Sequence, residues 1–520
     1  MVLGDILRRN SKLYPKRESL IHEDNRFTWA QTQGRVNSLV NGLINLGIKK
    51  GDRIAILSDN SHRYLEIYLA AAQAGFVIVP LNTMFKAGEL NGLLKNAEAT
   101  ALFCGKNHLD KKNILKKERS EIKHIIGLED HDCAHDYEHL IVNNPSKDTV
   151  IDVGPDDTFV IAYTSGTTGN PKGATLTHKN CYTAALIHSL EWRVSQADNY
   201  LFPGRLYFAA GGPKFIPFVR GCKVVVTNFE PHKTLELIER EKITFFSTGP
   251  TIISLLTNQP DISNFHLGSL RGIGFTSAPM PSSVWEKANQ VLGEVGVSTY
   301  GLTETNATGL ILQPEDVYRM EPSVRARRLG SVGKSMALMD VRVVDAEGRE
   351  ISWGTDKVGE IIIRGQTIMN GYWKNPEETA KAIKDGWFYT GDLAAIDEEG
   401  YVYIVDRKKD IIISGGINIS SREVEEILYM HEAVNQAAVI GVPDKKWGET
   451  VKAVVVLNKG IDVQEKELID FCKAGLASYK KPTSVDFLSA LPKTSSGKIN
   501  KWKLREKYWQ KKQKPRHEEV

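Results

Sequence analysis

The sequence predicts an α/β protein with two domains. We expect a large N-terminal domain of mainly parallel sheets covered by helices, with a small β-subdomain, and then a C-terminal α+β domain. Two observations support this: β-branched runs alternate with amphipathic stretches, and the pattern changes near residue 340. The length of 520 residues allows two or more domains and a large core.

The first part of the chain contains four strand–helix pairs. Each strand is a short β-branched run and each following stretch is amphipathic, which is typical of a parallel sheet covered by helices. The strands are expected at 53–58, 76–82, 223–228 and 243–249, and the helices at 61–75, 84–97, 232–242 and 250–259. The longest apolar stretch, 65–81, is interrupted by Glu66, Gln73, Gly75 and Pro80, so we expect a buried helix and strand there, not a membrane span.

The later part of the chain reads differently. Residues 340–354 and 359–365 predict strands joined by turns, as in an antiparallel β-subdomain. Residues 423–458 alternate helix and strand on the scale of a small α+β domain. The charged run DRKKD at 406–410 interrupts two apolar runs. We therefore place the boundary there and expect domains at 1–406 and 407–520.

Composition narrows the class of protein. The hydrophobic content is 41% and the charged content 25%, as in an ordinary soluble globular protein. A formal net charge of +4 is not the large positive excess that is typical of nucleic-acid-binding proteins. Five scattered cysteines indicate reduced thiols, and the N-terminus lacks an apolar core followed by a cleavage site. We expect a cytoplasmic protein with no nucleic-acid partner and no transmembrane segment. The sequence leaves a homodimer open.

The run YTSGTTGNPKG at 163–173 has the ingredients of a phosphate-binding loop, but it is not a P-loop. Pro171 occupies the place of the second required glycine, and Gly173 that of the magnesium-binding hydroxyl. A second stretch that resembles a P-loop, GSVGKS at 330–335, also fails the pattern because Arg328 stands where the first glycine should be. The run can still turn backbone N–H groups toward an anion and add hydroxyls and one ammonium. The residues that would do so are Thr164, Ser165, Gly166, Thr167, Thr168, Gly169, Lys172 and Gly173. Composition alone leaves a solvated turn as an equal alternative.

This run resembles the signature loop of the adenylate-forming superfamily, which includes acyl- and aryl-coenzyme A synthetases, peptide-synthetase adenylation domains and beetle luciferases. Five further motifs follow in the superfamily's order: YGLTET at 300–305, YTGD at 389–392, DRKKD at 406–410, SGGINIS at 414–420 and LPKTSSGKINK at 491–501. The resemblance spans nearly the whole chain. It implies ATP, Mg²⁺ and coenzyme A, a carboxylic acid substrate, and a C-terminal domain that is mobile about the 406–410 hinge.

YGLTET carries three candidate site residues. The ring of Tyr300 can stack on a purine, Thr303 can donate to a phosphate, and Glu304 offers magnesium a hard oxygen ligand. Taken alone, these residues are more readily explained by Tyr300 as a core aromatic and Glu304 as an acid at a helix start. The resemblance assigns the nucleotide and metal roles. It also places Gly301 beside the nucleotide, and Ser277, Ala278 and Pro279 along the adenine.

The C-terminal motifs supply the remaining polar groups. Asp392 can accept both ribose hydroxyls, although an Asx-turn explains an aspartate after glycine equally well. By resemblance, Arg407 helps to bind the nucleotide and Lys409 is a water-facing hinge residue. Lys498 is a mobile point charge that bridges the carboxylate and the α-phosphate, and it shares catalysis with Lys172, Thr303 and Glu304. The resemblance gives the coenzyme A contacts as Gly415, Gly416, Trp447, Tyr479 and Lys481.

The acyl pocket departs from the superfamily pattern. Relatives often read P-L-F-H where this chain has LFPGRLYFAAGG at 201–212, so the histidine is absent. The resemblance leaves Tyr207, Phe208, Thr276, Ser277, Gly301 and Gly309 as pocket residues. Nothing charged is evident among these segments, which favours a fatty acid or another hydrophobic acid, with aromatic and alicyclic acids open.

A histidine cluster at 131–139 offers a different reading. His131, His135 and His139 are spaced four apart and could bind zinc from one helix face. The segment is acidic and polar and has no second ligand cluster, which favours a solvated segment.

Three other functions remain in view. A peptide-synthetase adenylation domain normally needs an acid near 205–212, and RLYFAAGG has none. A luciferase-type oxygenase shares every motif. A non-catalytic nucleotide-binding relative would be expected to have lost Lys498, Glu304 or Asp392, and all three are present.

Overall fold

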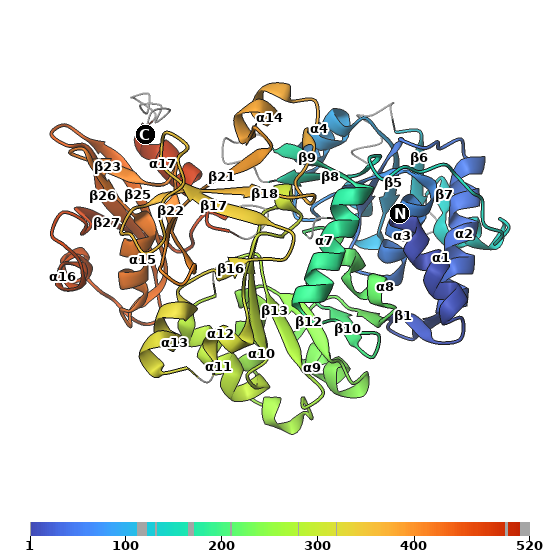
Figure 1. The fold of residues 1–520 in the computed structure, drawn as a ribbon, viewed down its shortest axis with the longest axis horizontal. Helices are drawn as coiled ribbons and strands as arrows, with labels where there is room; N and C mark the ends of the chain where they lie inside the picture. The colour runs from blue at the N-terminus through green and yellow to red at the C-terminus, as the bar shows by residue number, and fades with distance from the viewer. Residues whose placement is uncertain are drawn as a thin grey trace. The chain divides into compact units, whose positions relative to one another are not determined.

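The computed structural model describes residues 2–111, 122–129, 133–164, 171–208, 211–278, 280–318, 320–493 and 498–509 (Figure 1). The chain divides into two compact units. The first comprises Met1–Thr164, Pro171–Val341 and Ile363–Phe388. The second contains Arg342–Ile362 and the described residues from Tyr389 onward. The predicted boundary between residues 406 and 407 stays a prediction.

One sheet of the first unit is built around parallel strands. Its order is β19 (Gly371–Tyr372), β9 (Lys172–Thr177), β8 (Thr158–Thr164), β4 (Val77–Pro80), β3 (Arg53–Leu57), β5 (Ala99–Cys104), β6 (His124–Gly127), β7 (His135–Asp136). The pairs from β8 to β7 are parallel, whereas β19, β9 and β8 pair antiparallel. The central strands β3 and β4 read as continuous apolar runs because both faces are buried.

The second sheet of this unit has the same plan. Its order is β16 (Lys334–Ser335), β15 (Leu310–Leu312), β14 (Gly296–Tyr300), β13 (Gly272–Phe275), β12 (Phe245–Thr248), β10 (Asn199–Phe202), β11 (Lys223–Val226), β1 (Glu18–His22), β2 (Asn25–Thr28). The strands from β14 to β1 pair in parallel, and antiparallel strands flank them. The predicted mainly parallel architecture is confirmed.

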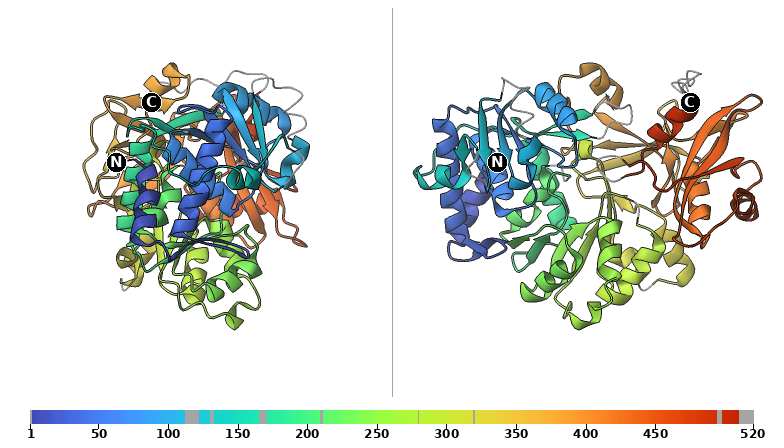
Figure 2. Two further views of the ribbon diagram at one scale, coloured as in Figure 1. Left: turned by 90° about the vertical axis from the view of Figure 1, so that its right-hand side faces the viewer. Right: turned by 180° about the vertical axis from the view of Figure 1, so that it is seen from behind.

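Helices follow these strands as predicted. They are α1 (Gly4–Leu13), α2 (Trp29–Asn45), α3 (His62–Ala74), α4 (Ala87–Ala97), α6 (Tyr137–Val142), α7 (His178–Glu191), α8 (Ile216–Arg220), α9 (Pro231–Arg240), α10 (Pro250–Thr257), α11 (Ser282–Leu292), α12 (Pro314–Val317), α13 (Pro322–Leu329) and α14 (Pro376–Ala382). The blue helices α1, α2 and α3 pack on one another, and α9, α10 and α11 lie side by side (Figures 1 and 2). Stretch 65–81 forms the end of α3 and strand β4, as expected. No described helix is both long and apolar enough to cross a membrane.

The β-subdomain predicted from residue 340 onward is a five-stranded sheet. It contains β17 (Asp340–Val344), β18 (Gly359–Arg364), β21 (Trp387–Ile396), β20 (Ile383–Lys384) and, paired with β21, β22 (Val402–Arg407). Strand β21 pairs antiparallel with β20 and with β22. The antiparallel pairing expected for this region is present.

The second unit ends in a sheet with helices on both faces. The strands are β23 (Ile412–Ser414), β24 (Ile417–Ile419), β25 (Val434–Asp444), β26 (Gly448–Leu457) and β27 (Ser484–Phe487), and the helices are α15 (Ser421–Tyr429), α16 (Glu465–Gly475) and α17 (Lys501–Trp509). Residues alternate along β25: Val439 packs with α15 and α16, whereas Ala438 and Ile440 pack with Leu504 of α17. The predicted α+β fold is confirmed.

Candidate active site

In the first unit, three predicted site segments follow parallel strands of one sheet. Strands β10, β12, β13 and β14 are adjacent and parallel, so their carboxyl ends lie along one edge. In open α/β sheets, ligands bind outside this edge. The predicted segments that begin there carry Tyr207 and Phe208 after β10, Thr276 and Ser277 after β13, and Gly301, Thr303 and Glu304 after β14.

The 300–309 loop is held closely against itself. A Cβ at Gly301 would lie 2.3 Å from the carbonyl carbon of Ala307. A Cβ at Gly309 would lie 2.9 Å from the carbonyl oxygen of Tyr300. Both glycines therefore allow two backbone segments to approach. Their assignment to the acyl pocket stays a prediction.

Buried hydroxyl and amide groups fix the same loop. Thr305 Oγ1 donates to the carbonyl of Thr308 at 2.6 Å, and Thr308 Oγ1 lies 2.7 Å from Thr367 Oγ1. Asn306 Oδ1 accepts a 3.0 Å hydrogen bond from the N–H of Gly212. The four residues whose side chains make these contacts are fully buried: Thr305, Asn306, Thr308 and Thr367. The loop therefore holds Glu304, between Thr303 and Thr305, in one place.

Glu304 belongs to a cluster with Lys172, Tyr372 and Glu378. The carboxylate is almost fully buried, and Glu304 Oε1 accepts a 2.9 Å hydrogen bond from the Tyr372 hydroxyl. The Lys172 ammonium lies 5.2 Å from the centroid of the Tyr372 ring and forms an ion pair with Glu378. This contact with Lys172 lowers the pKa of Glu378. Burial, together with the Glu304 charge, raises the pKa of Tyr372, which keeps its hydroxyl a donor.

Sequence reasoning missed Tyr372 and Glu378. They belong to GYWKNPEET at 371–379, far along the chain from Lys172. Strand β19 pairs antiparallel with β9, which sets Tyr372 opposite Ala174, two residues from Lys172. The polar composition of residues 371–379 indicates a turn. No feature of this stretch of sequence indicates that it pairs with β9.

The predicted phosphate-binding loop begins and ends at two paired residues. Thr164 and Lys172 face each other at the end of the β8–β9 hairpin, and Thr164 Oγ1 lies 3.3 Å from the carbonyl of Lys172. The predicted residues Ser165, Gly166, Thr167, Thr168 and Gly169 lie outside the described residues.

The other segments at the strand ends differ in exposure. Thr276 is half-buried, whereas Ser277 and Ala278 are exposed, and Ser277 adopts a left-handed φ of 74°. Pro279 lies outside the described residues. Tyr207 is buried, accepts a 2.7 Å hydrogen bond from Arg205 and packs on the more exposed Phe208 with ring centroids 4.4 Å apart.

In the second unit, Asp392 and Arg407 form a cross-strand ion pair. They are register partners in β21 and β22, and Arg407 Nε lies 3.0 Å from Asp392 Oδ1. Asp392 is buried, whereas the Arg407 side chain is 41% exposed. Lys409 is less exposed than expected for a water-facing residue: it is half-buried, and burial, reinforced by Arg407, lowers its pKa to about 8. Its hinge role stays a prediction.

Lys498 is exposed and comes directly before residues that anchor helix α17. Ile499 packs in the same apolar cluster as Leu504, on the second face of β25. Within α17, Lys501 forms a 2.8 Å ion pair with Glu425, and Arg505 pairs with Asp410. The segment that carries Lys498 is thus tied to the sheet and to the predicted hinge.

The predicted coenzyme A residues lie on the same unit. Gly415 has φ 58°, and a Cβ there would lie 2.7 Å from the Trp447 ring. Gly416, with φ 80°, has open space around its Cβ position. Trp447 and Tyr479 are each about half exposed, and Lys481 is half-buried. Large exposed aromatic side chains suit ligand contact, and the coenzyme A role stays a prediction.

The AMP-binding enzyme family model matches residues 7–373, and the model for the C-terminal domain of AMP-binding enzymes matches residues 423–498. The chain belongs to the AMP-binding enzyme family. The predicted membership of the adenylate-forming superfamily and the prediction of an enzyme are confirmed.

Two curated relatives and one solved structure show how far this likeness extends. The chain is 36% identical to a feruloyl-CoA synthase of an Amycolatopsis species, over 97% of this chain and 99% of the relative. It is 32% identical to the long-chain-fatty-acid–CoA ligase FadD13 of Mycobacterium tuberculosis, over 97% of this chain and 98% of the relative. The structure of the anthranilate CoA ligase AuaEII in complex with anthranoyl-AMP has a TM-score of 0.87 and 26% identity, and covers 98% of this chain and 97% of that one. The predicted resemblance to acyl-coenzyme A synthetases is confirmed.

The donor set of this AMP-binding enzyme suits magnesium. Mg²⁺ is usually held by one or two carboxylates together with substrate phosphates, and Glu304 supplies a carboxylate of which Tyr372 uses one oxygen. Glu304 would hold the ion, which when bound would neutralise phosphate charge.

His135 and His139 do not share one helix face. His135 lies in strand β7 and its Nε2 is 3.3 Å from Nδ1 of His124, whereas His139 lies in α6. His131 lies outside the described residues. Among the residues that the structure describes, no group of three or more metal ligands is close enough to hold an ion.

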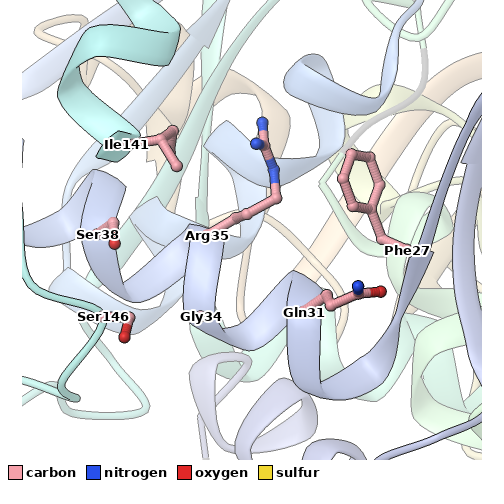
Figure 3. Close-up of a pocket in the computed structure, with 7 residues that line it drawn as sticks. All are labelled: Phe27, Gln31, Gly34, Arg35, Ser38, Ile141 and Ser146. Atoms are coloured by element: carbon pink, nitrogen blue, oxygen red, sulfur yellow. The ribbon is translucent and has the colours of Figure 1, made fainter. Parts of the chain in front are cut away.

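A shallow groove of about 350 Å³ lies elsewhere on the first unit (Figure 3). It is lined by Phe27, Gln31, Gly34, Arg35, Ser38, Ile141 and Ser146. The Arg35 guanidinium lies over the Phe27 ring and pairs with Glu66 and Glu138, so its charge is already satisfied. None of the predicted site residues lines this groove.

Proposed function

We propose that this enzyme is an acyl-coenzyme A synthetase. It activates a carboxylic acid with ATP as an acyl-adenylate, releases pyrophosphate, and transfers the acyl group to coenzyme A with release of AMP. A carboxylate oxygen is a poor leaving group, and the mixed anhydride replaces it with AMP. The observation that carries the proposal is the cluster of Lys172, Tyr372 and Glu304 in the first unit, whose strand ends also carry Tyr300 and Ser277.

The residues divide the work by chemistry. Lys172 and the hydroxyls of the 163–173 loop bind phosphate oxygens, and Glu304 would hold magnesium. Tyr300 stacks on the adenine. Asp392 accepts the ribose hydroxyls. Lys498 offsets the charge that builds between the acid and the α-phosphate.

The substrate class is a hydrophobic acid, with fatty and aryl acids as the two candidates. Tyr207 and Phe208 pack together beside the strand ends and offer apolar surface. One relative is named for a long-chain fatty acid and the other for the feruloyl group. The ring pair suits a flat aryl acid as well as an alkyl chain. We further propose that ATP, Mg²⁺ and coenzyme A are the co-substrates and cofactor, and that the enzyme works in the cytoplasm.

Pyrophosphate release from MgATP tests the proposal. The panel runs from acetate to palmitate and includes ferulate, benzoates, cyclohexane carboxylates and free amino acids, each with and without coenzyme A. Sustained release that requires both an acid and coenzyme A is expected, and the preferred acid names the substrate. A single burst unaffected by coenzyme A would indicate another acyl acceptor, and no release with any acid would contradict the proposal.

A further inference from the structure

Lys172 has an acidic partner on a helix that the predicted motifs do not include. Its ammonium forms an ion pair with Glu378 Oε2 while lying over the Tyr372 ring. The two side chains are 22% and 28% exposed, so the pair is only partly screened by solvent.

Glu378 is held in this position by its own surroundings. It lies in the first turn of α14, and its N–H donates to Asn375 Oδ1 at 3.1 Å. Its second carboxylate oxygen, Oε1, accepts a 2.9 Å hydrogen bond from Lys381. Because the helix and Lys381 fix the acid, the flexible four-carbon stem of Lys172 is the part of the pair that can move.

We propose that Glu378 is a displaceable counter-ion for Lys172, a positioning residue that sets how tightly the enzyme holds ATP and pyrophosphate. The proposal rests on the phosphate-binding role of Lys172 proposed above. To engage a phosphate oxygen fully, the ammonium must give up its contact with Glu378. The free energy of the ion pair is therefore lost when the nucleotide binds, and binding is weaker by that amount.

The same competition favours product release. Pyrophosphate presents a high charge to Lys172 and would otherwise leave slowly. When Lys172 returns to Glu378, the phosphate loses one of its cations. A fixed acid beside the binding lysine thus weakens the hold on substrate and product together.

The test compares Glu378→Gln with Glu377→Gln. Glu377 is the preceding residue on α14 and is exposed, so its variant removes the same charge without touching the Lys172 pair. We expect Glu378→Gln to lower the Kd for MgATP and the Ki for pyrophosphate by about threefold to fivefold, the factor given by a partly exposed ion pair. Glu377→Gln should leave both constants unchanged. Equal constants in the two variants would overturn the proposal.

A second background checks that the effect passes through Lys172. In Lys172→Met, ATP binding is weaker, and adding Glu378→Gln should change the Kd no further. A persistent effect there would mean that Glu378 acts by general repulsion, and would also overturn the proposal. Thermal unfolding of each variant confirms folding. If the unaltered enzyme neither binds MgATP nor releases pyrophosphate with any acid, the proposed function fails instead.

Discussion

The loop at 300–309 and the segment at 406–410 are fixed by different kinds of contact. The loop is fixed by hydrogen bonds between neutral groups. Thr305, Asn306 and Thr308 are fully buried and hydrogen-bonded within the first unit. The 406–410 segment is fixed by ion pairs, because Arg407 pairs with Asp392 and Asp410 pairs with Arg505.

This difference matches what each region is proposed to do. Short neutral hydrogen bonds in a dry environment keep one geometry, which Glu304 requires if it is the magnesium ligand proposed above. An ion pair with an exposed member, such as Arg407 with its 41% exposed side chain, can exchange its partner for water. We therefore expect the first region to hold a nucleotide and the second to allow movement of the segment that carries Lys498.

Lys498→Ala separates adenylation from ATP binding and has the largest expected effect. Carboxylate-dependent pyrophosphate release should fall by about 100-fold or more, because a cation aimed at the developing charge is lost. The Kd for MgATP should change by less than about twofold, because the predicted phosphate ligands are in the first unit. Lys503→Ala, at an exposed position of α17, is the matched control. Near-normal release, or lost ATP binding, would break the comparison.

Arg505→Met tests the charged segment. It leaves the largely buried Asp410 carboxylate without its main partner, and the free energy of unfolding should fall by about 3 kcal/mol. Burial alone would raise the pKa of Asp410, but Arg505, Lys501 and Lys409 hold it below its ordinary value. The stabilisation is therefore present above the ordinary pKa of an aspartate and is lost as pH falls below it. Denaturant unfolding of the two proteins should converge at low pH, and a constant difference would contradict the assignment.

Thr308→Val tests the neutral loop with a smaller effect. The buried hydroxyl contacts both the Thr305 carbonyl and Thr367, so its loss should lower the free energy of unfolding by about 1–2 kcal/mol. Salt should not change this difference, because no charge is involved. Thr251→Val, at an exposed position of α10, is the control and should be neutral. A salt-dependent loss would remove the distinction between the two regions.

Sequence patterns predicted the strands and the order of the motifs because both are local. The continuous apolar runs of β3 and β4 and the charged 406–410 segment can be seen in the sequence by themselves. Which strands would be neighbours was not local information. The parallel rhythm implied a sheet, and only the pairing of β10, β12, β13 and β14 brought their polar ends to one edge.

The misses have physical causes of the same kind. Tyr372 reaches the site because β19 pairs with β9 nearly two hundred residues away in sequence. His135 and His139 have helical spacing, but a strand ends between them and the helix begins only at Tyr137. Lys409 reads as an exposed charge, yet it is half-buried beside Arg407.

Lys409→Met gives the smallest expected effect and sharpens the account of the charged segment. Burial, reinforced by Arg407, lowers the pKa of Lys409 to about 8 from an ordinary value of 10.5. Between these two values the unfolded chain binds more protons, so the free energy of unfolding should rise with pH. The rise should be roughly 1 kcal/mol, less than the full shift because solvent screens a half-buried group. In Lys409→Met this rise should be absent from denaturant unfolding measured between pH 7.5 and pH 10, in buffers of matched ionic strength. An unchanged slope would mean that Lys409 is fully solvated, and the segment would then be held by its ion pairs alone.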